Sequence, residues 1–382
     1  MPKPAEVGPL ALTPGSIVLH IGVHKTGTTA IQSALANSRA ELAALGIAYP
    51  GSLQAHRLVA SSAMNRRLGW RVGGAPPPDP DMWNHFVDDA HNYSGITVCS
   101  SEFFAESSDE IAEGIIQRIG LGRVHVVLTL RNLARILPSA WQQILKSGYA
   151  TGYELWLEQV FAAEVTEPKP QTFWNRHRHD QVVQRWAGLV GPENMTVIVV
   201  DDTDPDDIYR NFETLLGIPS DTLFNRRVES ANRSMTLEEA EFLRHLNLSV
   251  GGGPGWKVYG NAAHDSLIKG MIERRRPAQL ESRMLTPQWA LDRAADLAST
   301  YVEAIRDSGV HVVGNLDVLS QRYQAPPTIS DAEPTSMPIS AAISAILGAM
   351  DGFRSSEDQS RPKRLKKRVK KLQVALRSKG RS

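Results

Sequence analysis

Short apolar runs rich in β-branched residues recur along this chain and alternate with stretches that favour helices. The apolar runs lie at 16–22, 95–101, 123–130 and 194–202, and the helical stretches at 28–42, 109–120 and 180–191. Apolar strands that alternate with helices are typical of a parallel sheet with helices on both faces. The pattern therefore predicts an α/β fold of three layers around a central parallel sheet.

Segments of different composition flank this pattern. In chain order, we expect an N-terminal leader at 1–16, a main domain at 17–322, a linker at 323–360 and a basic tail at 361–382. The linker is inferred from its proline and serine content, and the apolar run at 341–350 predicts a short helix within it.

The tail holds an unusual share of the positive charge. The formal net charge is +1, yet residues 361–382 contain 11 of the 42 Lys and Arg residues and no acid. The rest of the chain therefore carries 31 basic against 41 acidic side chains, a net charge near −10. A short basic amphipathic helix is predicted here, with one apolar face formed by Leu365, Val369, Leu372 and Leu376.

Such a helix indicates peripheral docking on an anionic membrane surface. A disordered, solubilising tail is the alternative. A second alternative is weak contact with nucleic acid, which any cationic segment can make. We expect no specific nucleic-acid partner.

Amino-acid composition and cysteine content indicate in which cellular compartment the protein is expected. Hydrophobic residues make up 42% and charged residues 22% of the chain, as in soluble globular proteins. Cys99 is the one cysteine, so no internal disulfide forms, and no run has the length of a signal peptide or a membrane span. We therefore expect a cytoplasmic protein, with peripheral attachment to the inner membrane face as the open alternative.

No metal site is expected. His177 and His179 are two positions apart, so their side chains would diverge on a helix. The stretch that contains them, 175–180, is interpreted as solvated.

The segment "HIGVHKTGTT" (20–29) joins the first strand to the first predicted helix. Gly22 and Gly27 have the spacing of a P-loop, but Thr28 follows where a P-loop has lysine, and Lys25 lies inside the loop. A glycine loop that leads into a helix presents backbone N–H groups and a favourable dipole to an anion. The displaced lysine weakens a triphosphate interpretation, and a simple tight turn is the structural alternative.

The longer block "HIGVHKTGTTAIQ" resembles the 5′-phosphosulfate-binding loop of sulfotransferases that use 3′-phosphoadenosine 5′-phosphosulfate (PAPS), in its bacterial "HKTGTT" form. The resemblance implies a P-loop-NTPase-like fold and a donor site formed by His24, Lys25, Thr26, Gly27, Thr28 and Thr29. It also implies that Lys25 neutralises the charge on the departing phosphate, without a metal.

A second motif supports this resemblance. In "LTLRNLARILPSAWQQ" (128–143), Arg131 ends a predicted strand and Ser139 follows eight residues later. This resembles the 3′-phosphate-binding motif of the same superfamily, and an arginine fork with a hydroxyl suits a phosphate. The alternative is a surface arginine beside an ordinary helix.

Sulfonyl transfer to an alcohol requires a base near the acceptor hydroxyl. The Lys-x-x-His pattern of the cytosolic aryl and steroid enzymes is missing, while glycan and tyrosyl-protein branches commonly use a glutamate. Glu102, just past a predicted strand, is the first candidate, with helix capping as its alternative. His56 is the second candidate.

These expectations combine into a PAPS-dependent sulfotransferase that yields adenosine 3′,5′-bisphosphate (PAP). The acceptor would be a hydroxyl of a glycan, glycolipid or lipid, or of another small molecule. The alternatives are a P-loop small-molecule kinase and a non-catalytic nucleotide-binding or membrane-associated partner protein.

Overall fold

The computed structural model describes residues 12–67, 78–163, 173–227, 233–251, 264–278, 281–326, 334 and 336–355. Its contacts divide the chain into two compact units. The first comprises Met1–Trp141, Tyr153–Glu229 and Leu285–Pro327, and the second Gln142–Gly152, Ser230–Met284 and Thr328–Ser382. The range 17–322, expected to form one domain, thus includes residues of both units. The basic tail lies outside the described residues.

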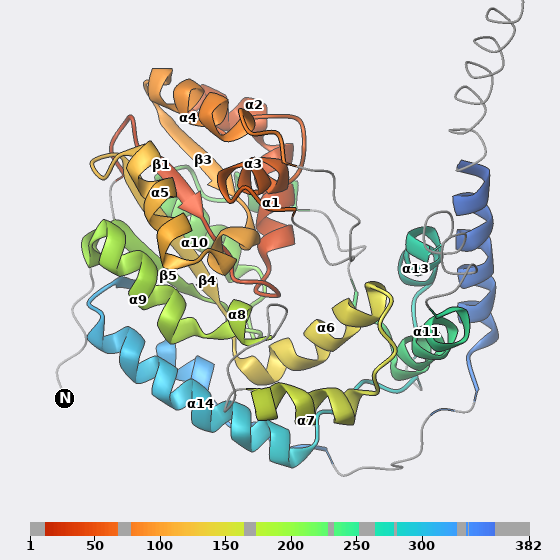
Figure 1. Ribbon diagram of the computed structural model, residues 1–382. Helices are drawn as coiled ribbons and strands as arrows, with labels where there is room; N and C mark the ends of the chain where they lie inside the picture. The colour runs from red at the N-terminus through yellow and green to blue at the C-terminus, as the bar shows by residue number, and fades with distance from the viewer. Residues whose placement is uncertain are drawn as a thin grey trace, which may run out of the picture. The chain divides into compact units, whose positions relative to one another are not determined.

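A six-stranded, all-parallel sheet forms the centre of the first unit (Figure 1). Its strands are β1 (Ile17–His20), β2 (Ile47–Ala48), β3 (Ile96–Ser100), β4 (Val124–Leu130), β5 (Met195–Val199) and β6 (His311–Val313). They lie side by side in the order β2-β3-β1-β4-β5-β6. The predicted α/β fold with a central parallel sheet is confirmed, as are the four predicted strands, while β2 and β6 were not predicted.

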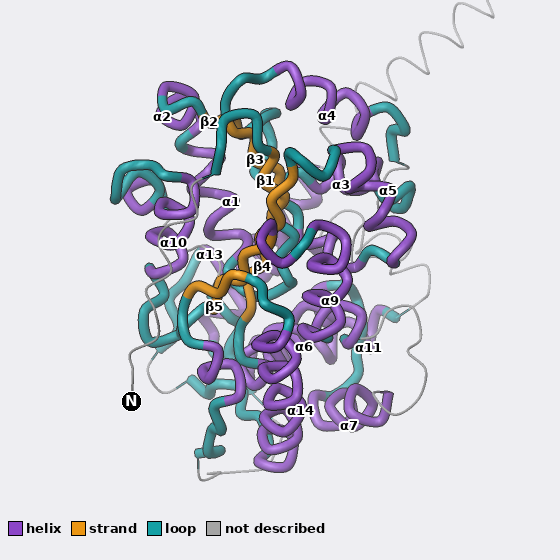
Figure 2. Tube along the Cα trace, turned by 90° about the vertical axis from the view of Figure 1, so that its left-hand side faces the viewer, coloured by secondary structure: helices purple, strands orange, loops and turns teal. Residues whose placement is uncertain are grey.

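Helices cover both faces of this sheet, shown in orange among purple helices in Figure 2. Along β1, Ile17 and Leu19 enter one apolar cluster and Val18 enters the other, because successive side chains of a strand point to opposite faces. The first cluster contains residues of α3 (Arg57–Ala63), α4 (Met82–Asn92), α5 (Asp109–Ile119), α9 (His179–Val190) and α14 (Gln288–Asp307). The second contains residues of α1 (Thr28–Asn37), α2 (Arg39–Ala44) and α10 (Asp207–Leu216).

The predicted helices at 109–120 and 180–191 are confirmed as α5 and α9, but the stretch 28–42 forms two helices. Ser38 lies between α1 and α2 with φ −97° and ψ 10°, outside the helical geometry. This residue is buried, and its hydroxyl donates to the Thr222 carbonyl at 3.4 Å. A side chain held in this way favours a helix boundary over continuation.

Further helices complete the two units. The first unit also contains η1 (Glu102–Glu106), α7 (Tyr153–Ala163), α8 (Trp174–His177), η2 (Pro192–Asn194), η3 (Phe224–Arg226) and η4 (Leu316–Ser320). The second contains α11 (Leu237–Val250), α13 (His264–Glu273) and a helix over 339–355 that includes the apolar run at 341–350. The helix α6 (Leu133–Lys146), with Pro138 inside it, belongs to both. Among the described helices, none has the length and apolar content needed to span a membrane.

Candidate functional site

The predicted site residues gather at one edge of the sheet. Lys25 follows β1, Glu102 follows β3 and Arg131 follows β4, and these three strands are neighbours. The carboxyl ends of parallel strands share an edge, so loops from distant parts of the sequence meet there. From β1 the chain crosses to β2 and β3 on one side and then to β4, β5 and β6 on the other, so the order of the strands switches direction next to β1. Open α/β sheets bind their ligands at such a switch point.

The loop between β1 and α1 has the geometry of an anion cradle. Gly22 (φ 90°), Lys25 (φ 67°) and Gly27 (φ 83°) all adopt left-handed backbone conformations. For Lys25 this conformation costs about 1 kcal/mol or more. Among the described residues, no side chain caps α1 and no acid lies in its first turn. The first N–H groups of α1 therefore face the loop without a carboxylate to compete for them.

Gly22 lies directly against Glu102. A Cβ atom at position 22 would be 2.7 Å from the Cβ of Glu102 and 2.8 Å from its Cα. Only glycine allows this approach, and the left-handed φ of Gly22 also favours glycine. The loop between β1 and α1 and the start of η1 are therefore in close contact, which places Glu102 beside the loop.

A buried hydrogen-bond network connects Glu102 to the floor of the loop. The amide of Gln32 donates to Glu102 Oε2 at 3.1 Å and to Ser100 Oγ at 3.2 Å. Ser100 Oγ lies 2.8 Å from His20 Nδ1, whose ring extends toward Thr129. Burial lowers the pKa of His20 to about 4, although the charge of Glu102 opposes the shift. The imidazole is therefore neutral at pH 7.

Thr26 completes the floor of the loop. Its hydroxyl lies 2.6 Å from Thr129 Oγ1 and donates to the Val23 carbonyl at 2.7 Å. Thr26 is fully buried, so its side chain stabilises the loop from below. Thr28 is buried at the first position of α1, while Thr29 and Gly27 are exposed.

A buried carboxylate, Glu106, holds the loop from the side. It bonds His24 Nε2, Arg176 Nε and Arg66 Nη2, each at 2.8 Å. Burial raises the pKa of Glu106, but the hydrogen bond from His24 and the guanidinium of Arg176 outweigh it, so the pKa lies well below its ordinary value. Sequence reasoning missed Glu106 and Arg176, since no local motif marks contacts across 70 or more positions.

Arg131 connects the second motif to the first. Its guanidinium forms an ion pair with Asp202, which follows β5, and Nη1 donates to the Lys25 carbonyl at 3.5 Å. Arg135, one turn into α6, approaches the same carboxylate at 3.6 Å. Ser139 is half-buried on α6, one further turn along.

His56 occupies a structural position next to β3. Its Nδ1 accepts from the Ser100 N–H at 3.1 Å, and its Nε2 donates to the Pro50 carbonyl at 2.9 Å. Burial lowers the pKa of His56 to about 4, and the ring packs edge-on against Tyr49 and Phe86. Both ring nitrogens of His56 are engaged in these hydrogen bonds, so His56 has no free lone pair with which to accept a proton.

Acid should destabilise this fold through such neutral histidines. The pKa of His56 is about 4 when folded against 6.5 as the reference, so the unfolded chain takes up the proton first. Stability is then full above pH about 6.5 and falls toward pH 4, by roughly 3 kcal/mol for this residue at about 1.4 kcal/mol per pH unit. Urea unfolding between pH 7 and pH 4 measures the loss.

The His56→Gln variant should reduce that pH dependence while costing about 1–2 kcal/mol at pH 7, where it loses a hydrogen-bond partner. His85→Gln, at an exposed position of α4, is the matched control and should behave as wild type. Equal pH slopes for wild type and His56→Gln would contradict the assignment.

The interpretation of 175–180 as solvated was wrong at three positions, since His177, His179 and Asp180 are all buried. His177 and His179 are each 1% exposed, because α8 and the start of α9 pack them against Phe173 and Tyr301. Burial lowers the pKa of His177 well below its ordinary value, and nearby charges, Lys25 among them, contribute. Within the part of the chain that the structure describes, no three His, Cys, Asp or Glu residues are grouped as metal ligands.

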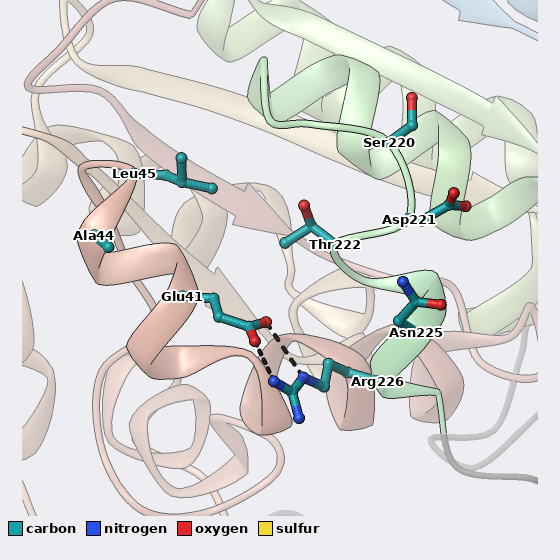
Figure 3. Close-up of a pocket in the computed structure, with 8 residues that line it drawn as sticks. All are labelled: Glu41, Ala44, Leu45, Ser220, Asp221, Thr222, Asn225 and Arg226. Atoms are coloured by element: carbon teal, nitrogen blue, oxygen red, sulfur yellow. Dashed lines mark hydrogen bonds and ion pairs between the residues drawn. The ribbon is translucent and has the colours of Figure 1, made fainter.

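A separate pocket of about 640 Å³ lies between α2 and the segment 220–226 (Figure 3). It is lined by Glu41, Ala44, Leu45, Ser220, Asp221, Thr222, Asn225 and Arg226. An ion pair between Glu41 and Arg226 crosses it. None of the predicted site residues lines this pocket, so it is distinct from the predicted site.

Comparisons with known proteins give little further information. No protein-family model and no curated protein matches the chain. Among solved structures, the chain is similar to the crystal structure of a sulfotransferase from Alicyclobacillus acidocaldarius, at 17% identity with a TM-score of 0.41. The likeness covers 63% of this chain and 94% of that chain. At this level of similarity, the function must be inferred from the residues of the site.

Proposed function

We propose that this protein is a sulfotransferase that moves a sulfonyl group from PAPS to an acceptor hydroxyl. One observation carries the proposal: the two phosphate-binding motifs, 106 positions apart in the sequence, meet where the Arg131 guanidinium reaches the Lys25 carbonyl. Two cationic residues thus follow neighbouring strands at one edge of the sheet, beside a helix N-terminus that no described side chain caps. A donor with phosphates at both ends of its ribose matches two such binding sites.

The 5′ end of the donor would bind in the loop. The first N–H groups of α1, the hydroxyls of Thr28 and Thr29, and the Lys25 ammonium supply the donors. His24 and Thr26 would support the loop, through Glu106 and Thr129 respectively. The 3′-phosphate would bind Arg131, whose planar guanidinium suits it, with Ser139 as a further donor.

The chemical step would use Glu102 and Lys25. The acceptor oxygen attacks the sulfur, and its proton passes to the Glu102 carboxylate. The bond between sulfur and the bridging oxygen breaks, and its electron pair remains on the phosphate, next to the Lys25 ammonium. Gln32 positions the carboxylate by its bond to Oε2. In-line transfer requires the attacking and the leaving oxygen to lie on opposite sides of the sulfur. Glu102 and Lys25 would therefore act on opposite sides of it.

The acceptor that we propose is a hydroxyl of a glycan, glycolipid or lipid, and the nucleotide product is PAP. The direct test incubates the purified protein with PAPS and candidate acceptors, with a chelator present, and follows PAP release and sulfated product by mass spectrometry. We expect PAP formation without added Mg²⁺. Transfer from ATP that depends on Mg²⁺, with no binding of PAP, would overturn the proposal in favour of a kinase.

The Arg131→Ala variant should separate the two ends of the donor. Hydrogen bonds to charged groups contribute about 1.5–3 kcal/mol, so PAP affinity should fall about 10- to 100-fold. Affinity for adenosine 5′-monophosphate, which lacks the 3′-phosphate, should change little. Calorimetry with both nucleotides measures the difference.

Arg135→Ala is the matched control for this variant, since Arg135 also approaches Asp202 but at 3.6 Å and from a half-exposed position. It should bind PAP nearly as wild type does. If Arg131→Ala lowered the affinity for PAP and for adenosine 5′-monophosphate by the same factor, a specific contact with the 3′-phosphate would be contradicted.

A further inference from the structure

The helix over 339–355 has its large and small side chains on unexpected faces. Its buried positions are occupied by small residues: Ala341, Ser344, Ala345, Gly348 and Gly352. Its exposed positions include six large apolar residues: Ile339, Ile343, Ile346, Leu347, Met350 and Phe353. Ile339 is 78% exposed and Ile346 is 59% exposed. A helix of a globular protein normally buries its large apolar face, so this helix presents the opposite arrangement. We call these six residues the apolar stripe.

Close backbone contacts fix this orientation. The helix, drawn in blue in Figure 1, packs against α13 through glycines on both sides. A Cβ atom at Gly270 would lie 2.4 Å from the Ser344 carbonyl oxygen, and one at Gly348 would lie 2.2 Å from the Ser266 carbonyl oxygen. Arg274, which directly follows α13, also forms an ion pair with Asp351. Rotation of the helix would place isoleucine or leucine where only glycine fits, so the stripe cannot turn inward.

The apolar stripe is continuous along the helix. Its residues follow at spacings of four, three, one, three and three positions, which keeps them on one helical face. No charged residue belongs to the stripe, and the neighbouring Asp351 is paired with Arg274. An exposed apolar patch of this kind marks an interaction surface rather than scattered surface residues.

Charge indicates what covers the stripe. Residues 361–382, which begin six positions after the last described residue of this helix, contribute 11 Lys and Arg residues and no acid. The partner must therefore offer an apolar interior and a negative surface within a short distance. A bilayer with anionic headgroups offers both. In a second copy the same helix would instead be followed in sequence by the same 11 cationic residues, with no acid among them.

We propose that the apolar stripe inserts at the boundary between the headgroups and acyl chains of an anionic membrane, with the basic tail held at the membrane surface. The helix would lie in the plane of the interface, where amphipathic helices bury their apolar face among the acyl chains. This proposal concerns the second unit alone and does not depend on sulfonyl transfer.

The test uses the full chain and vesicles of defined composition. Wild-type protein should sediment with vesicles of phosphatidylcholine and phosphatidylglycerol, and much less with phosphatidylcholine alone. The double variant Ile346→Glu/Met350→Glu should lower the partition coefficient on anionic vesicles more than tenfold. Because both side chains are exposed, the thermal unfolding midpoint should stay close to wild type.

Leu248→Glu is the matched control, an equally apolar position of α11 in the same unit that is 63% exposed. It should bind anionic vesicles as wild type does, and PAP binding should be unchanged in every variant. The proposal is overturned if wild type does not sediment with anionic vesicles, or if the double variant sediments equally well. Lipid-independent dimers that Ile346→Glu/Met350→Glu abolishes would also overturn it, in favour of a second copy.

Discussion

Replacing Lys25 by methionine should lower the rate of sulfonyl transfer about 10²- to 10³-fold, the usual loss when one group that stabilises developing charge is removed. Lys25 is half-buried in the loop after β1, and its backbone lies next to Arg131. Methionine keeps the length of the side chain and removes its charge. Charge that develops on the bridging oxygen would then lose the cation that we propose to stabilise it. The rate with saturating PAPS and acceptor measures the effect.

Two variants make this result specific. Lys25→Arg keeps the positive charge but carries it on a longer, planar group. Its transfer rate should therefore lie between those of wild type and Lys25→Met. Lys269→Met, at an exposed position of α13, should have the wild-type rate. The unfolding free energy of Lys25→Met should stay within about 1 kcal/mol of wild type, since the left-handed backbone at position 25 is equally strained with either side chain. A near-normal transfer rate would rule out the assigned role.

Glu102→Gln should lower the rate about 10²- to 10⁴-fold, the range expected for loss of a general base. Glutamine has the same shape but cannot take the acceptor proton. It can still bond Gln32, so the loop and its contact with Gly22 should persist. PAP affinity should therefore stay near wild type while the turnover number falls. Calorimetry with PAP measures the affinity, and steady-state kinetics measure the turnover number.

The controls for Glu102→Gln are a carboxylate and a histidine. Glu110→Gln, at an exposed position in the first turn of α5, should not change the rate. His56→Gln should be less stable than wild type but should have the wild-type transfer rate at neutral pH. Both ring nitrogens of His56 form hydrogen bonds within the fold. If instead the transfer rate fell in His56→Gln and stayed at the wild-type value in Glu102→Gln, His56 rather than Glu102 would be the base.

The sequence predicted the sheet and its loop because both depend on local patterns. Four apolar runs were long enough to predict strands, and the glycine spacing around Lys25 predicted the strand-to-helix loop. The two short strands, β2 with two residues and β6 with three, carry too little pattern to predict. Their place at the sheet edges depends on pairing with β3 and β5.

Long-range contacts account for most of what the sequence did not predict. Glu106 holds His24 and Arg176 across 82 and 70 positions, and neither distance leaves a local signal. His177 and His179 lie in a polar stretch, yet tertiary packing buries them. Periodicity at 339–355 gives the two faces of a helix but not which one points inward. Here glycine contacts with α13, not hydrophobicity, decide it.

If the proposed reaction is correct, the contact between Gly22 and Glu102 limits how this protein could be redesigned. Any larger residue at position 22 would displace the backbone that carries the carboxylate, so donor geometry and proton acceptance would change together. Mutant libraries that aim to widen acceptor choice should leave both positions untouched and vary the surrounding surface instead.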